Sequence, residues 1–306
     1  MIIMLAILLE FFSLGFTKET DQFTDRFENM QMLKDSTPIL DKWFNQRLLA
    51  AQKKFKPQMT EGEKFEIVQK QYVGQMSPAF QTPIYSWMEL SINRFKIAEY
   101  KPKNRGIYQD TNLKDVGWVG VLGITPTIKV NSVLIGKDKL GHFICQGLQY
   151  YREYVRQIKN GATDEEAKQK VLELGHELEM TSQGLTTDGV YSVADLAANW
   201  QGFTFWKNLF SGDNSYFLLI DGQHRLTRKF SLKDYVTHDF DEALNPSFFN
   251  KKSTFLKVTK NIQDYCQLTQ NRLDQFDHSS RWLSQNYLVS DFGQNLWRPN
   301  FDCILK

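Results

Sequence analysis

The 306-residue sequence is short of cysteine, of excess charge of either sign and of long apolar runs. Its three cysteines show no CxxC or Cys/His spacing, so the pattern of a structural zinc site is missing. The formal net charge is only +2, and no basic run, RNA-binding aromatic motif or zinc-finger spacing occurs. Nucleic acid is therefore not an expected partner.

Repeats, low-complexity segments and extended coiled-coil heptads are also missing. What remains is the composition of an ordinary folded protein, with 42% hydrophobic and 24% charged residues. Aromatic residues make up 14% of the chain, which suits either a large core or stacking against sugars.

The first apolar stretch, residues 1–16, is too short to span a bilayer comfortably and resembles the core of a signal peptide. It departs from that pattern because no Lys or Arg precedes it and Glu10 interrupts it. The alternatives are a start further upstream or a buried helix. We expect export to the periplasm or secretion, with no membrane span after removal of the signal. Cys266 with Cys303 is the expected disulfide, and Cys145 is expected to be a buried free cysteine.

Apolar spacing and capping signals predict a mainly α fold. We expect an N-terminal helical region over 17–110 and a motif-bearing region over 111–306, or one continuous domain over 17–306. The sequence between them, 100–135, is rich in glycine and β-branched residues and predicts a loop with one or two short strands.

Helices are expected after Ser36, Thr60, Pro83, Thr163 and Ser192. Further helices are expected over 137–159 and 254–288. Glycine-containing turns predict one hairpin over 183–191 and another around Asp221-Gly222.

Two sequence signatures contain most of the candidate catalytic and binding residues. The first is Asp138-Lys139-Leu140-Gly141-His142-Phe143. The second begins with an acid and continues as GL-x-T-T-x-G-V-Y-S-x-A-D-L-A-A-N-x-x-G up to Gly202. Over 136–206 they resemble a family of exported lysozyme-like enzymes of predatory bacteria, which cut deacetylated peptidoglycan. The same paired signatures are similar to those of VanZ-like proteins and periplasmic lipoproteins.

The resemblance to the lysozyme-like family implies a helical domain with a small β-hairpin, here with an N-terminal helical extension. It implies cleavage of peptidoglycan glycan strands by general acid catalysis. The acid of the pattern aligns better with Glu179 than with Glu177, and these two side chains point about 200° apart on a helix. Either acid is alternatively a solvated residue at a helix end.

Asp188 is the expected second carboxylate, which would hold or activate water, or else it is an ordinary turn residue. We expect the residues of the two signatures to bind substrate or support the site, and Asp138, His142, Asp195 and Asn199 to converge. The set comprises Thr186, Thr187, Tyr191, Ser192, Asp195, Asn199, Asp138, Lys139 and His142.

Structural roles compete with these assignments. Ser192 and Asp195 match a capping box, and Asp138 matches an N-cap. Asp138 and His142, with His176 and either Glu177 or Glu179, also offer nitrogen and oxygen ligands for a metal-dependent hydrolase, although we expect no metal and no cofactor. The contrasting interpretation is a non-enzymatic VanZ-like envelope protein in which these residues form a buried polar network.

Overall fold

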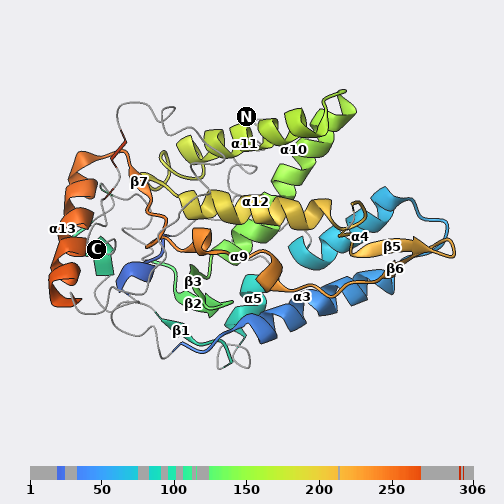
Figure 1. Cartoon of the computed structure of the whole chain (residues 1–306), viewed down its shortest axis with the longest axis horizontal. Helices are drawn as coiled ribbons and strands as arrows, with labels where there is room; N and C mark the ends of the chain where they lie inside the picture. Colours follow the sequence, from blue (N-terminus) through green and yellow to red (C-terminus); the bar gives the residue numbers. More distant parts are fainter. Residues whose placement is uncertain are drawn as a thin grey trace, which may run out of the picture.

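The computed structural model describes residues 19–24, 33–74, 83–90, 96–100, 106–111, 115, 124–212, 214–269, 296–297 and 299. The described part is mainly helical with short strands (Figure 1). The expected signal peptide, the Cys303 end of the expected disulfide and the second half of the expected 254–288 helix lie outside these residues.

Three helices form the N-terminal part: α3 (Thr37–Gln52), α4 (Glu61–Val73) and α5 (Pro83–Glu89). The helix expected after Thr60 begins with a capping box at α4, where the Thr60 hydroxyl accepts from the Glu63 N–H and the Glu63 carboxylate accepts from the Thr60 N–H. The apolar face of α3 is buried as its spacing predicts.

A small antiparallel sheet leads to the first signature. Its strands are β1 (Glu99–Tyr100), β2 (Thr127–Val130) and β3 (Val133–Gly136), in that order. Every residue of β3 is buried, and the strand ends two residues before Asp138. The short strands expected within 100–135 are therefore confirmed, and they fix where the first signature begins.

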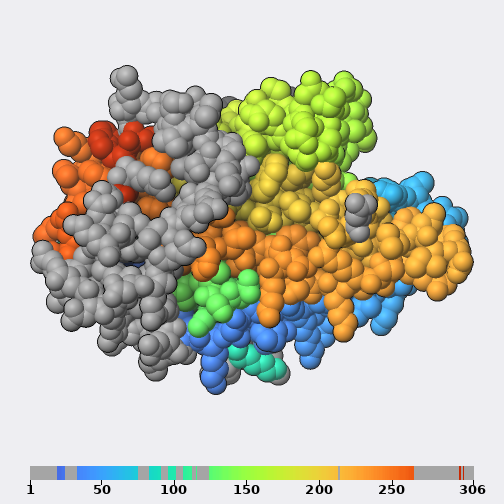
Figure 2. All heavy atoms as spheres, viewed as in Figure 1, coloured from blue at the N-terminus to red at the C-terminus, as the bar shows by residue number. Residues whose placement is uncertain are grey.

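The two signatures lie on helices that pack together. The first covers α9 (Lys139–Gly141) and the start of one π-helical turn (His142–Gln146), called the π-turn below, and the helix continues beyond it as α10 (Gly147–Lys159). Next come α11 (Asp164–Met180) and α12 (Val193–Lys207). On the face drawn in Figure 2, α10 and α11 form a ridge beside α12.

The hairpin expected over 183–191 is wrong. Residues 181–189 form a series of turns, and strand β4 (Val190–Tyr191) pairs with the distant strand β7 (Phe248–Phe249). The glycine-rich composition predicted the turn, but it carried no information about a partner strand nearly sixty residues further along the chain. The second expected hairpin is confirmed as β5 (Phe217–Ile220) and β6 (Gln223–Leu226), joined through Asp221-Gly222.

The remaining described elements are short turns and one helix: η1 (Gly106–Tyr108), η3 (Leu232–Asp234), η4 (His238–Phe240) and α13 (Lys252–Thr269). Among the residues that the structure describes, no helix combines the length and apolar character needed to cross a bilayer.

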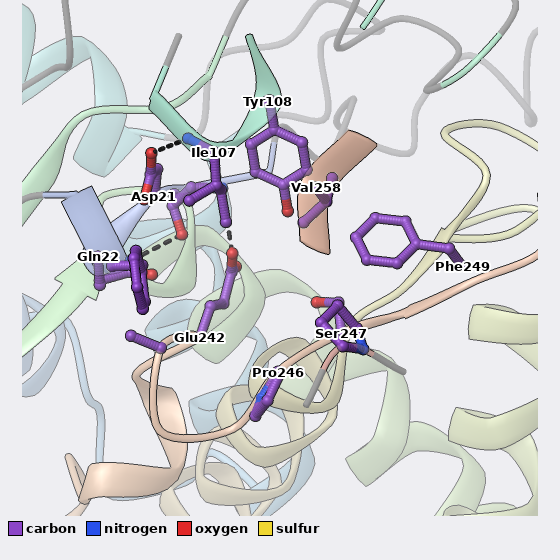
Figure 3. A pocket seen from close by; sticks show the side chains of 13 residues that line it. Asp21, Gln22, Ile107, Tyr108, Glu242, Pro246, Ser247, Phe249 and Val258 are labelled. Carbon is purple, nitrogen blue, oxygen red and sulfur yellow. Dashed lines mark hydrogen bonds between the residues drawn. The ribbon is translucent and has the colours of Figure 1, made fainter. Parts of the chain in front are cut away.

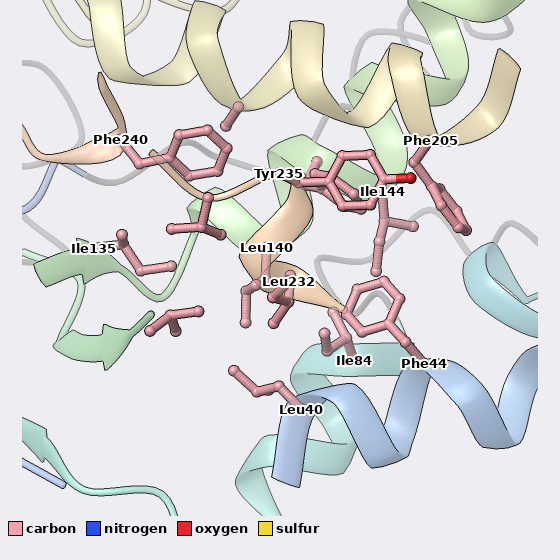
Figure 4. Packing of buried hydrophobic residues seen from close by; sticks show 14 of the residues in the cluster. Leu40, Phe44, Ile84, Ile135, Leu140, Ile144, Phe205, Leu232, Tyr235 and Phe240 are labelled. Carbon is pink, nitrogen blue, oxygen red and sulfur yellow. The ribbon is translucent and has the colours of Figure 1, made fainter. Parts of the chain in front are cut away.

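One hydrophobic cluster continues from the N-terminal helices into the motif-bearing part (Figure 4). Phe44 of α3 stacks on Phe230 with ring centroids 4.2 Å apart, and its ring edge meets Phe143 of the π-turn. Phe143 in turn packs against Phe205 of α12. The high aromatic content is thus used in the core, which holds the two signature helices in fixed positions.

Candidate functional site

Two glycines allow the signature helices to approach closely. A Cβ on Gly202 of α12 would lie 1.9 Å from the Phe143 carbonyl oxygen, and a Cβ on Gly147 would lie 2.5 Å from the Gly202 carbonyl carbon. No side chain fits at either position, so the backbones meet directly. This approach places the polar residues of the π-turn against those of α12.

Lys139 is the centre of the resulting polar cluster. Its side chain is completely buried, and its Nζ lies 2.7 Å from Asp138 Oδ2, 2.6 Å from Asp195 Oδ1 and 2.6 Å from Glu242 Oε1. Burial disfavours the charged ammonium, but the surrounding carboxylates outweigh it and raise the pKa of Lys139 well above its usual value. The three carboxylates therefore favour the charged form of the buried Lys139 side chain.

A second chain of contacts extends from Asp195 into the helix pair. Asp195 Oδ2 lies 3.3 Å from His142 Nε2, and His142 Nδ1 lies 3.1 Å from Asn199 Oδ1. The Asn199 amide donates to the Tyr150 hydroxyl at 3.3 Å. Burial opposes ionisation of Asp195, but His142 and Lys139 lower its pKa. The predicted convergence of Asp138, His142, Asp195 and Asn199 is confirmed.

The local capping roles predicted for two of these acids are wrong. Ser192 does cap α12 by accepting from the Asp195 N–H at 3.2 Å, but the Asp195 carboxylate pairs with Lys139 and His142 instead of returning to the Ser192 N–H. Asp138 makes no side-chain cap bond either. In both cases an ion pair with the buried ammonium replaces the local hydrogen bond.

A metal could find ligands here. One ligand atom each of Asp138, His142 and Asp195 lies within 4.8 Å of the others, and such oxygen and nitrogen donors suit zinc or iron. The Lys139 ammonium, however, already contacts both carboxylates. A divalent ion at this position would face that positive charge at close range, so the donor set fits a metal less well than its composition indicates.

The cluster includes two acids that the sequence analysis did not single out, Glu19 and Glu242. Glu242 Oε2 accepts from the Thr20 N–H at 3.2 Å, and burial raises the pKa of Glu242 to about 7. Burial and then the charges of Glu242 and Asp195 raise the pKa of Glu19 well above its usual value. Neither acid belongs to a local pattern, so spacing along the chain gave no signal for them.

Glu179, the expected general acid, lies in the last turn of α11 with 1% of its surface exposed. Its Oε2 accepts from the Ser192 N–H at 3.2 Å, and its Oε1 has no hydrogen-bond partner. Burial, followed by repulsion from Asp195, raises the pKa of Glu179 well above its usual value. Glu177 is exposed, so the predicted opposite orientation of these two acids is confirmed.

The turn after α11 brings the second expected acid close to the same cluster. Asp188 is fully buried and adds to the upward pKa shifts of Glu179 and Glu19. The positive φ of the turn falls on Gly189 and not on Asp188, so backbone conformation does not account for an acid here.

The other polar residues of this turn contact the protein. The Thr187 hydroxyl donates to the Ser182 carbonyl at 2.6 Å, and the Tyr191 hydroxyl lies 3.0 Å from His176 Nδ1. Thr186 is exposed. Thr187 is half-buried, so Thr186 is the more exposed of the two threonines.

Packing closes over Glu179. A Cβ on Gly184 would lie 2.7 Å from Glu179 Oε2, which shows how closely the turn covers the carboxyl. A pocket lies beside the cluster, and Glu242 forms part of its wall (Figure 3). Comparison of the chain with protein-family models, with curated proteins and with solved structures finds no match.

Proposed function

We propose that the protein is an exported glycoside hydrolase that cuts bacterial peptidoglycan, with Glu179 as the general acid. The observation that carries the proposal is a buried carboxyl with a raised pKa and one oxygen without a partner. A carboxylic acid that stays protonated near neutral pH can give its proton to a glycosidic oxygen. Unpaired buried polar atoms and perturbed pKa values are both concentrated at functional sites.

In this mechanism Glu179 protonates the leaving oxygen, and Asp188 holds the water that attacks the opposite face of the sugar ring. Because Glu179 is 1% exposed, the turn over 181–189 has to move aside before a glycan strand can reach the carboxyl. Deacetylated peptidoglycan is the proposed substrate because the exported lysozyme-like family that the two signatures resemble cuts it.

The same burial favours a second candidate function. If the turn stays closed, Glu179 belongs to a non-enzymatic polar network like the one proposed for VanZ-like envelope proteins, and the cluster binds a ligand or stabilises the fold. The two candidates differ in whether the protein releases fragments from peptidoglycan.

Fragment release from acetylated and deacetylated peptidoglycan by purified variants tests the proposal. We expect Glu179→Gln to remain folded and to lose about two to four orders of magnitude in rate, because the amide has no acidic proton. The rate of fragment release by Asp188→Asn should lie between the rates of Glu179→Gln and the wild type. The matched control is Glu177→Gln, which changes an exposed acid on the same helix and should keep its activity.

If Glu177→Gln loses activity and Glu179→Gln keeps it, Glu177 is the general acid and our assignment of Glu179 is wrong. No release by the wild type would leave the envelope-protein candidate, whereas full activity in both variants would show that neither Glu177 nor Glu179 is the general acid.

Export is part of this proposal, because peptidoglycan lies outside the cytoplasm. We expect the mature protein to begin near Thr17, after removal of the apolar segment 1–16. N-terminal sequencing of protein purified from the producing cells measures this directly. An intact Met1 on cytoplasmic protein would contradict it.

A further inference from the structure

The β5–β6 hairpin forms one end of the molecule (Figure 1). Three successive residues of β5 are large, apolar and exposed: Leu218 has 45% of its surface in solvent, Leu219 has 65% and Ile220 has 36%. Elsewhere among the described residues, large exposed apolar side chains occur singly along the chain, as at Leu90 and Leu256. Single exposed apolar residues are ordinary, whereas a contiguous group marks a surface that binds a partner.

The root of this hairpin is firmly packed, so that only its tip is exposed. Phe217 is 1% exposed, and its ring centroid lies 5.1 Å from that of Phe55 and 5.2 Å from that of Phe210. β6 is the strand that lies along α3. β5 is therefore the outer strand of a hairpin that is anchored at its root.

The backbone of β5 has a hydrogen-bonding edge at Leu219 that β6 does not use. The turn residues 221–222 both have positive φ, so they form a two-residue loop that the hydrogen-bonded pair Ile220 and Gln223 closes. The next pair, Leu219 with His224, is then of the non-hydrogen-bonded kind. The N–H and C=O of Leu219 therefore point away from β6, and in the described part of the chain this sheet has no third strand.

An edge of this kind can pair with a strand from another chain, and proteins usually block it with charged residues or proline. Residues 217–220 contain neither. Antiparallel pairing of β5 with its own copy, about a two-fold axis at Leu219, places Leu218 opposite Ile220 of the second copy. These two residues lie on one face of the strand, so the pairing would gather four exposed apolar side chains there.

The charges at the two ends of the hairpin complement each other in this arrangement. Asp221 is exposed at the tip, and the segment 53–56 carries three exposed lysines beside the root, where Phe55 contacts Phe217. Antiparallel pairing centred on Leu219 places position 221 of one copy opposite position 217 of the other. Each acidic tip therefore approaches the lysine-rich root of the second copy.

The same mixture of charges makes an anionic lipid surface a poorer occupant. Glu61 and Glu63 are exposed at the start of α4, and the neighbouring Lys64 Nζ lies 3.1 Å from His224 Nδ1 of the hairpin. Together with Asp221, these acids offset much of the attraction of the lysines for anionic lipid. Opposite charges at one end of a molecule suit a self-complementary interface.

We propose that β5 is an interface strand that pairs antiparallel with β5 of a second copy of the chain, about a two-fold axis at Leu219. The contact is confined to the two hairpins and their roots, so the dimer is weak and depends on protein concentration. The proposal does not depend on hydrolysis of peptidoglycan, because the hairpin contains none of the proposed catalytic residues.

Sedimentation velocity of the full chain over a range of concentrations tests this interface. We expect a reversible monomer–dimer equilibrium for the wild type. Leu219→Lys should weaken dimerisation at least about tenfold, because it places two like charges directly opposite each other at the centre of the interface. Asp221→Lys should weaken it a few-fold. The matched control is Leu256→Lys, which changes an exposed leucine on α13 and should dimerise as the wild type does.

Cysteine cross-linking tests the register of the pairing. A two-fold axis at Leu219 brings position 219 next to its own copy, with the Cα atoms about 5.5 Å apart, a separation that a disulfide spans. On oxidation, Leu219→Cys should form covalent dimers well above the background of the wild type, and the control Leu256→Cys should not.

Three results would overturn the proposal: a wild type that stays monomeric, a dimer that Leu219→Lys does not weaken, or no cross-linking of Leu219→Cys above background. Binding of vesicles of anionic lipid by a monomeric wild type would also overturn it and would assign the hairpin tip to a membrane surface.

Discussion

Glu177 and Glu179 stand two positions apart on α11 and have opposite surroundings. Glu177 is in solvent, whereas Glu179 lies against Ser192, Gly184 and the buried cluster. The difference follows from helix geometry, since two residues differ by about 200° around the axis. The opposite orientation of these two acids could be predicted from the sequence, because it depends only on their spacing along one helix.

Residues whose partners are distant in sequence were predicted less well. Asp195 was assigned to a capping box because its spacing from Ser192 is correct, but attraction to Lys139 and His142 determines where its carboxylate lies. Glu19 and Glu242 had no local signal at all. Their roles depend on burial and on charges brought together by the fold.

Helices and caps were more predictable than strand pairing. The capping boxes of Thr60 and Thr163 are present, and Gly161 has the positive φ expected after the end of a helix. The strand Val190–Tyr191, in contrast, pairs with residues 248–249, which no short-range pattern could indicate. The chemistry of a turn can be predicted from its own residues, but the partner of an adjoining strand cannot.

At the scale of elements, the contact between the π-turn and α12 holds the site together. Gly202→Ala should destabilise the protein by about 1–3 kcal/mol or more, because the new methyl group would overlap the Phe143 carbonyl. The matched control is Gly62→Ala on α4, where the nearest atom to a Cβ is 4.0 Å away. That change should stabilise the helix by up to about 1 kcal/mol.

Denaturant unfolding of both glycine variants measures these differences. Equal stability of Gly202→Ala and the wild type would mean that the close approach of the two signature helices is not required.

At the scale of the whole molecule, the excess of buried acids makes stability depend on pH. Burial raises the pKa of Glu19 and Glu179 well above the usual value and that of Glu242 to about 7. The folded protein therefore binds more protons than the unfolded chain above about pH 4.5, and its free energy of unfolding falls as pH rises. For Glu242 this fall ends above its folded pKa of about 7.

We expect the free energy of unfolding to be a few kcal/mol larger at about pH 5 than at about pH 8. Acids with lowered pKa values, such as Asp195, have the opposite effect only at lower pH. Urea unfolding at the two pH values measures the difference. Glu179→Gln should reduce the pH dependence, and greater wild-type stability at the higher pH would contradict the account.

The central claim is that Glu179 carries a proton at neutral pH. Infrared difference spectroscopy of the wild type against Glu179→Gln, at about pH 7, measures this most directly, because protonated and ionised carboxyls absorb at different frequencies. We predict that the wild type has a protonated-carboxyl band that is missing in the variant. If the difference spectrum instead shows the loss of an ionised carboxylate, Glu179 is not held as an acid and the proposed mechanism is wrong.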